Sequence, residues 1–229
     1  MNCYNCRKEI SENENHAEHI PAKNLYSTYH AKYKNNLLKV PCCFDCNNSF
    51  SKIDQEIRDA IGILNKNNEI QSELTKKSVK SILRSKEGNK RIEFLDEKNQ
   101  FQVSFNYDDF QKLHVKNFKG LFYNKYGLPF PINFEFCLIG EGDENNEKLQ
   151  KIKKQLNTYL DLDKNWSIVG HKDIFKYKIK AMIPNYNGIF NDGLDIENSI
   201  SFVCKMEYHN IIKPLLFINR KDNMTNLKQ

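Results

Sequence analysis

The sequence Cys3-Tyr-Asn-Cys6 has a counterpart, Cys43-Phe-Asp-Cys46, and 36 residues separate the two. Two residues separate the cysteines of each pair, so both thiolates can bind one ion, and two pairs complete the tetrahedral shell that zinc prefers. The spacer exceeds the roughly 15–20 residues of a simple zinc ribbon, so we expect an inserted structure between the pairs. Cys42 would break the spacing and is expected to be a neighbour of the site. The sequence therefore predicts a structural zinc on Cys3, Cys6, Cys43 and Cys46, with no coordination position left open.

The composition of the chain limits the classes of protein to which it can belong. The length of 229 residues is enough for one large domain or two small ones. Hydrophobic residues make up 39% of the chain, which is enough for a packed core. The N-terminus lacks the pattern of a secretory signal, and no apolar run reaches the roughly 20 residues of a membrane span. We therefore expect a cytoplasmic protein with no membrane partner, whose seven cysteines stay reduced. The net charge of +6 is compatible with a polyanionic partner.

Three segments with different patterns predict an α+β protein. Residues 1–64 hold the cysteine pairs and end in a helical pattern that starts at Asn47. Residues 65–90 are expected to form a basic helical segment or linker, because eight basic and three acidic side chains lie in the stretch 65–91. A solvated helical face is the favoured interpretation of that charge, and a surface that follows nucleic-acid phosphates is the alternative. Residues 91–229 are expected to be a separate α+β domain that selects the substrate or binds a partner.

The last segment is expected to combine strands with one amphipathic helix. The helix is predicted from Leu149 to Tyr159, where apolar residues recur at three- and four-residue spacing. Aromatic residues crowd the stretch 118–126, and we expect them in the core, with base stacking as the alternative. Cys137 and Cys204 lie in apolar strands and are expected to pack in the core. The predicted strands are 91–95, 101–105, 133–139, 177–183, 200–208 and 214–218.

Two further features connect the cysteine pairs to a known family. The insert contains Glu18-His19-Ile20-Pro21, and Asn47 directly follows the last cysteine. The order C-x2-C, Glu-His-x-Pro, C-x2-C-Asn resembles the zinc-bearing members of the HNH endonuclease superfamily, over roughly the first 55 to 60 residues. The resemblance implies a zinc-stapled ββα-metal module of treble-clef-like type. Leu38 stands where the family has its central Asn, and His30 is a candidate for the missing orienting hydrogen bond.

The resemblance also implies roles for individual residues. His19 would be the general base that activates water, and Glu18 and Asn47 would bind a catalytic Mg²⁺ or Mn²⁺. Lys23 and Lys52 are candidates for phosphate contacts. The reaction would be hydrolysis of phosphodiester bonds in DNA, with RNA as an open alternative. By analogy with stand-alone proteins of this type, the setting would be restriction or phage defence.

General chemistry is consistent with these roles. Hydrolysis of a phosphodiester requires an activated water and neutralisation of charge on the phosphoryl oxygens. A histidine has a pKa near neutrality and is a natural base, and a carboxylate binds hard divalent cations. Glu18 and His19 are neighbours, so in a regular strand their side chains point to opposite faces. We expect a bent strand, or a metal at the strand edge, to bring them to one site.

Two alternatives stay open at this stage. A module with the same zinc site could bind nucleic acid or protein without cleaving anything. The C-terminal domain could also sense a partner and keep an intact nuclease silent. DNA is the first expected partner, and a homodimer or a regulatory protein is a further one, because a double-strand break usually needs two active sites. His16 is expected to be a solvated loop residue.

Overall fold

The structure, a computed structural model, contains both helices and sheets, which confirms the α+β class. The chain divides into two compact units. The first consists of Met1–Phe130 with Val169–Phe175 and Tyr208–Ile212, and the second of the remaining segments. The expected division after residues 64 and 90 stays a prediction. The structure describes residues 1–26, 33–64, 69–85, 92–95, 100–104, 106–139, 146–184, 190–191 and 201–221.

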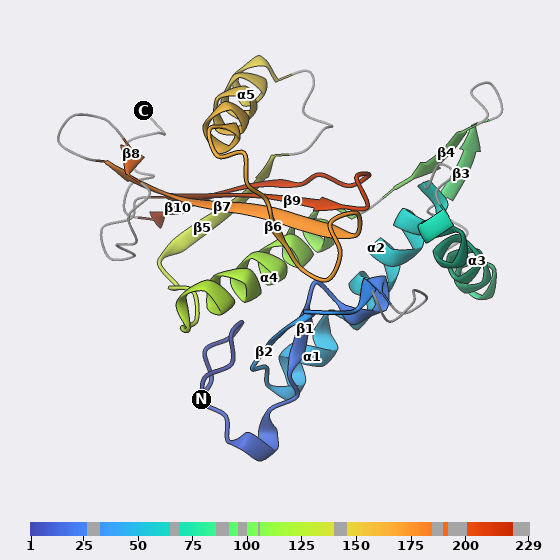
Figure 1. Cartoon of the computed structure of the whole chain (residues 1–229), viewed down its shortest axis with the longest axis horizontal. Coiled ribbons are helices and arrows are strands. Elements are labelled where there is room, and N and C mark those ends of the chain that lie inside the picture. Colours follow the sequence, from blue (N-terminus) through green and yellow to red (C-terminus); the bar gives the residue numbers. More distant parts are fainter. Residues whose placement is uncertain are drawn as a thin grey trace. The chain divides into compact units, whose positions relative to one another are not determined.

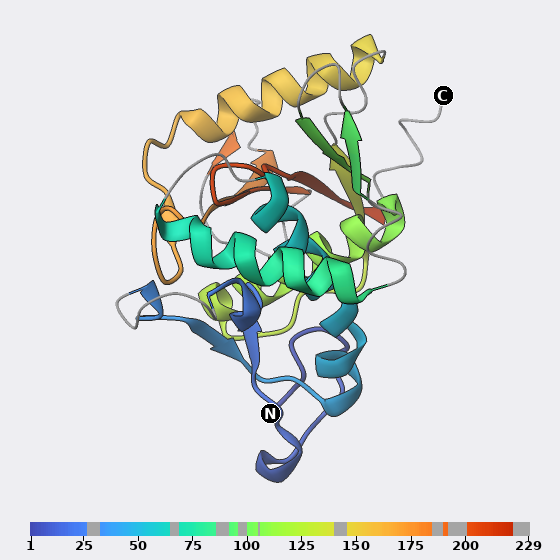
Figure 2. The same ribbon diagram turned by 90° about the vertical axis from the view of Figure 1, so that its right-hand side faces the viewer.

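The first unit begins with two strands and a helix in that order (Figures 1 and 2). β1 (Glu18–Ile20) pairs antiparallel with β2 (Leu38–Val40), and His19 lies opposite Lys39 in this register. α1 (Phe44–Ser49) follows β2. Two short 3-10 helices lie before and after β1, namely η1 (Glu12–Glu14) and η2 (Lys23–Leu25).

α2 (Ser51–Leu64) and α3 (Glu69–Arg84) lie side by side in the first unit (Figure 1). The expected helical pattern up to residue 64 is confirmed, although it is divided at Phe50 into α1 and α2. α3 covers residues Glu69–Arg84 of the segment expected to be a basic helix or a linker. A Cβ on Gly62 would lie 2.1 Å from Oγ of Ser78, so the absence of a side chain there allows α3 to approach α2 closely.

α4 (Tyr107–Tyr126) packs against β1 and ends at Gly127, whose φ of +73° is the left-handed conformation that favours glycine. Gly120 faces Ile20 so closely that a Cβ would lie 2.4 Å from Cγ1 of Ile20. Lys116 is one helical turn before Gly120 and therefore lies on the same face of α4. The close packing at Gly120 thus places the Lys116 side chain next to β1.

Aromatic side chains of α4 belong to the core of the first unit. Phe118 and Phe122 are fully buried, and both rings meet Phe130 edge-on, with centroid distances of 4.9 and 4.8 Å. The core interpretation of this stretch is therefore confirmed for these residues. His114 is also buried, with Nδ1 3.2 Å from the hydroxyl of Tyr208, and burial lowers its pKa to about 3. Its imidazole is therefore neutral at physiological pH.

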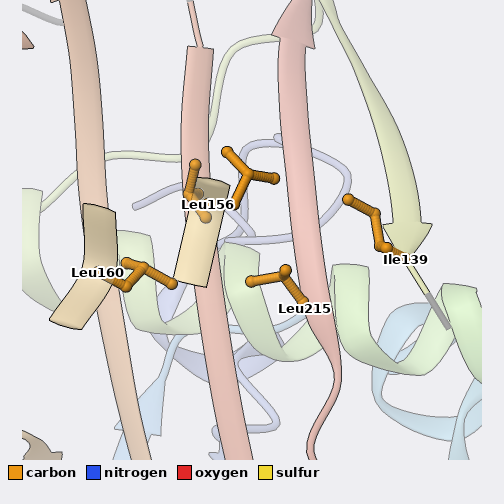
Figure 3. Packing of buried hydrophobic residues seen from close by; sticks show 5 residues of the cluster. Ile139, Leu156, Leu160 and Leu215 are labelled. Carbon is orange, nitrogen blue, oxygen red and sulfur yellow. The ribbon is translucent and has the colours of Figure 1, made fainter. Parts of the chain in front are cut away.

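In the second unit α5 (Glu147–Asp161) covers a sheet with the strand order β5-β10-β9-β7-β6, in which β8 also pairs with β7. Figure 3 shows leucines of α5 directed at side chains of the sheet. This core cluster consists of Ile139, Leu156, Leu160, Val203 and Leu215. The expected helix and four of the expected strands are confirmed. The strands are β5 (Phe134–Ile139), β6 (Ser167–Ile168), β7 (Phe175–Pro184), β8 (Phe190–Asn191), β9 (Ser201–Tyr208) and β10 (Leu215–Arg220).

The remaining hairpin pairs β3 (Ile92–Leu95) with β4 (Gln100–Val103) antiparallel, which confirms the two strands expected there. Cys204 is buried, as expected, but Cys137 is exposed, so the prediction of a core position for Cys137 is wrong. Alternate side chains of a strand share a face, so Cys137 lies on the same face of β5 as the buried Ile139. Among the described residues, no helix has the length and apolar character needed to cross a membrane.

Candidate functional site

The four thiols expected to bind a metal lie together in the structure. The sulfurs of Cys3, Cys6, Cys43 and Cys46 all lie within 4.8 Å of one another, and those of Cys6 and Cys43 are 3.7 Å apart. Cys3 and Cys43 are buried, whereas Cys6 is exposed. Within the described part of the chain, this is the only group of three or more Cys, His, Asp or Glu side chains close enough to share an ion. The four cysteines can therefore hold a metal ion.

Backbone hydrogen bonds bring the two cysteine pairs together. The first pair lies in a tight turn, in which the amide of Arg7 donates to the carbonyl of Cys3 at 2.9 Å and Arg7 has a φ of 68°. The second pair begins α1, with Cys43 as the N-cap. The amide of Tyr4 donates to the carbonyl of Pro41 at 2.9 Å and joins the two pairs. The site thus depends on both the N-terminal turn and the start of α1.

Cys42 is a buried neighbour of the four thiols and is not one of the group. A hydrogen bond with its side chain lowers the pKa of Cys3 to about 3, and the same contact raises the pKa of Cys42. A thiol that donates to a thiolate stabilises the charged form of its partner. The hydrogen bond from Cys42 therefore favours the thiolate of Cys3, which is the form that binds metals.

Polar groups from α4 and the N-terminal turn lie beside the sulfurs. Nδ2 of Asn5 donates to Sγ of Cys46 at 3.5 Å, and Nζ of Lys119 donates to Oδ1 of Asn5 at 3.2 Å. Burial lowers the pKa of Lys119, while nearby cysteines, Cys46 first, raise it. A lysine in this position places positive charge close to a group of thiolates, and partners of this kind orient metal ligands. Sequence reasoning did not find Lys119, which is 114 residues from Asn5.

His19 is half-buried at the centre of β1, and its environment favours the neutral imidazole. Its Nδ1 is buried, with no hydrogen-bond partner among the described residues. Burial lowers the pKa of His19, and the positive charges of Lys39, Lys23 and Lys116 lower it further. A neutral histidine on which several positive charges act combines a proton acceptor with the charge that attracts a phosphate. Lys39 was missed from the sequence, but the antiparallel register identifies it as the cross-strand partner of His19.

Glu18 lies on the other face of β1, where it is buried with Lys116 and Asp54. Nζ of Lys116 is 3.2 Å from Oε1 of Glu18 and 2.7 Å from Oδ2 of Asp54. Burial raises the pKa of both carboxyl groups, and Lys116 opposes this shift. Lys116 also lies over the ring of Phe50, 5.2 Å from its centroid. This buried triad ties β1, α2 and α4 together, and neither Lys116 nor Asp54 was expected in it.

The other predicted residues have separate places around this region. Asn47 is half-buried in α1, directly after the last cysteine. Lys23 is exposed in η2, and Lys52 is exposed in the first turn of α2. Leu38, which stands in place of the family's central Asn, pairs with Ile20 in the β1–β2 register. His30 lies outside the described residues. The roles assigned to His19, Glu18 and Asn47 stay predictions.

Comparison of the chain with protein-family models, with curated proteins and with solved structures found no match. The arrangement of the described residues is therefore the basis for an argument about function.

Proposed function

We propose that this chain is a metal-dependent endonuclease of the HNH type, which hydrolyses phosphodiester bonds in DNA or RNA. One observation carries the proposal. Four thiols from the N-terminal turn and the start of α1 lie close enough to share an ion, and β1 carries a half-buried histidine opposite Lys39 of β2. The order of two antiparallel strands and a helix is the order of a ββα-metal module. DNA is the favoured substrate.

The four sulfurs suit a structural zinc. In a regular tetrahedron with Zn–S bonds of about 2.3 Å, the sulfurs are about 3.8 Å apart. The distance between Cys6 and Cys43 is 3.7 Å, and all four sulfurs lie within 4.8 Å of one another. Four thiolates leave zinc no position for water or substrate, so its role in the proposal is to hold the module together.

His19 is the general base in the proposed mechanism. Its neutral imidazole accepts a proton from the attacking water, and the water oxygen then forms the new bond to phosphorus. Lys39 and Lys23, whose charges already act on His19, offset the negative charge that grows on the phosphoryl oxygens. The bond from phosphorus to the leaving oxygen of the sugar breaks as the new bond forms.

Glu18 and Asn47 would hold a divalent cation in this proposal. A carboxylate and an amide oxygen are ligands that suit Mg²⁺ or Mn²⁺. Lys116 already pairs with Oε1 of the buried Glu18, so the cation would have to replace this ammonium as the partner of the carboxylate. Such a cation would neutralise charge on the phosphate and on the leaving oxygen.

The burial of Glu18 favours one second candidate, a zinc-dependent module that binds nucleic acid or protein without cleavage. Its carboxylate is paired with Lys116 away from the face of His19. Leu38 also replaces an Asn of the family motif. In this alternative the thiols and the lysines keep their roles, and Glu18 serves only to join β1 to α4.

Zinc-loaded wild-type protein is expected to cut supercoiled plasmid when Mg²⁺ or Mn²⁺ is added, and to leave it intact when neither cation is added. In this account the cation is required because it neutralises the charge that develops on the leaving oxygen. Agarose gels report nicked and linear products, and single-stranded DNA and RNA are tested in parallel. If protein that retains zinc binds these nucleic acids but cuts none of them with either metal, the binding module is the correct account.

A further inference from the structure

The groove between α2 and α3 carries a concentration of positive charge. It has a volume of about 630 Å³, and basic side chains of both helices line it. These are Arg58, Lys76, Lys77, Lys80 and Arg84. Glu73 is the one acidic residue of its lining, and its carboxylate is paired with Lys76 at 2.7 Å. Arg58 is also paired, with Asp59, so Lys77, Lys80 and Arg84 supply the excess of positive charge in the lining.

The cations of α3 follow a single face of the helix. Lys76, Lys80 and Arg84 are four residues apart, so they form a row that extends over roughly 12 Å at 1.5 Å per residue. Like charges at this spacing repel one another and destabilise a helix. The row therefore opposes the stability of α3, and a polyanion in the groove would relieve that repulsion. Each strand of duplex DNA carries a phosphate for each 3.4 Å of helix axis, so the row matches about three to four phosphates of such a strand.

The floor of the groove is held in place by hydrogen bonds. Arg58 is buried, with an exposed fraction of 7%. Its Nη2 donates to Oγ of Ser81 at 3.1 Å. Its Nε donates to Oδ1 of Asp59 at 2.8 Å. Gln55 donates to the same Ser81 hydroxyl at 2.9 Å. The two contacts with Ser81 connect α2 to α3, and they hold the α2 side of the groove in a fixed position next to the cations of α3.

Burial and neighbouring charges both act on Lys77. Burial lowers its pKa, and the nearby Arg58 lowers it further, whereas Asp59 opposes the shift. A bound phosphate would favour the charged form of such a lysine. The lining of the groove is also connected to a candidate nuclease residue through the sequence and through ion pairs. Gln55 follows Asp54, which shares Lys116 with Glu18 of β1.

We propose that the α2–α3 groove binds the sugar–phosphate backbone of a nucleic acid and guides it along the first unit. The choice of nucleic acid as the ligand rests on the proposed function, whereas the location of the binding site rests on the charge and shape of the groove. The hollow shape and the polar lining favour a narrow strand over a flat anionic membrane surface. Contacts to phosphate alone predict binding with little dependence on base sequence.

The test compares two variants with equal loss of charge. Lys76→Gln, Lys80→Gln and Arg84→Gln are combined in the groove variant. Lys148→Gln, Lys151→Gln and Lys154→Gln are combined on α5 in the control variant. Fluorescence anisotropy measures binding of labelled single-stranded and duplex DNA of random sequence, without added divalent cations, so that cleavage does not interfere. Circular dichroism and zinc content check that both variants fold.

The groove variant is expected to bind DNA about ten- to a hundredfold more weakly near 0.1 M salt, and the control variant to bind as the wild type does. The slope of log K against log salt should become shallower by roughly 2 to 3 in the groove variant, since each phosphate contact contributes about 0.9. Unchanged affinity of the groove variant overturns the inference, and so does an equal loss in both variants. Binding to vesicles of anionic lipid that depends on the groove, without such dependence for DNA, also overturns it.

The outcomes separate this inference from the nuclease proposal. If the wild type cleaves DNA but DNA binding does not depend on the groove, the groove inference is wrong and the nuclease proposal stands. DNA binding that depends on the groove, without cleavage under any divalent metal, supports the groove and contradicts the nuclease.

Discussion

Cys43→Ser is expected to abolish zinc binding and to unfold the N-terminal part of the chain. The substitution removes one of the four thiolates, and small zinc modules obtain much of their folding free energy from the metal. It should not harm α1 in any other way. Cys43 is the N-cap of α1 and makes no capping hydrogen bond with its side chain, while serine is among the best N-cap residues. A loss of structure therefore reports the loss of the metal ligand.

Metal analysis and circular dichroism measure this effect. We expect about one zinc per wild-type chain, close to none in the variant, and loss of helical signal. Cys137→Ser is the matched control, because Cys137 is exposed in β5 of the second unit. A strong chelator should unfold the same segment of the wild type, and added zinc should restore it. Full zinc content in Cys43→Ser would show that the four cysteines are not the ligand set.

Lys116→Met is expected to destabilise the first unit by about 3–5 kcal/mol, the usual cost of removing one partner from a buried ion pair. Lys116 is fully buried, and its ammonium lies between Glu18 and Asp54. Methionine keeps the length and apolar stem of the side chain but leaves two buried carboxyl groups without a cation. The loss should appear as an earlier unfolding transition in urea.

Lys112→Met on the same helix is the matched control. Lys112 and Asp109 form an exposed pair at 3.7 Å, and such pairs contribute less than about 1 kcal/mol. Adding Asp54→Asn to Lys116→Met should recover part of the stability, because one of the two stranded charges is removed. A loss below about 1 kcal/mol for Lys116→Met would mean that the triad is not a structural centre.

Local patterns in the sequence were sufficient for much of the fold. The paired cysteines predicted a group of thiols that the structure brings together, and the three- and four-residue spacing of apolar residues predicted α2 and α5. Alternation along the last segment predicted the main strands of the second sheet. These features depend on neighbours close in the sequence, so no knowledge of tertiary packing was needed.

Contacts between distant segments could not be predicted in the same way. Lys116 is 62 residues from Asp54, and nothing in its neighbourhood distinguishes it from a solvated lysine of an amphipathic helix. Only the close approach of Gly120 to Ile20 places it beside β1. Cys137 illustrates a different limit, because the period of a strand predicts the face of a side chain but not how far a covering helix extends. A single sequence therefore predicted the helices, the strands and the group of cysteines better than it predicted buried contacts between distant residues.

Single-turnover cleavage of supercoiled plasmid by His19→Ala is the most direct test of the nuclease account. Protein with full zinc content is used with Mg²⁺ or Mn²⁺, beside the wild type and His16→Ala. His16 is exposed, three residues before His19, and its ring lies edge-on to Phe44 at 5.2 Å. The account predicts that His19→Ala cuts about 10²- to 10⁴-fold more slowly than the wild type, as expected for loss of a general base, and that His16→Ala cuts at the wild-type rate. Equal rates for wild type and His19→Ala would contradict it.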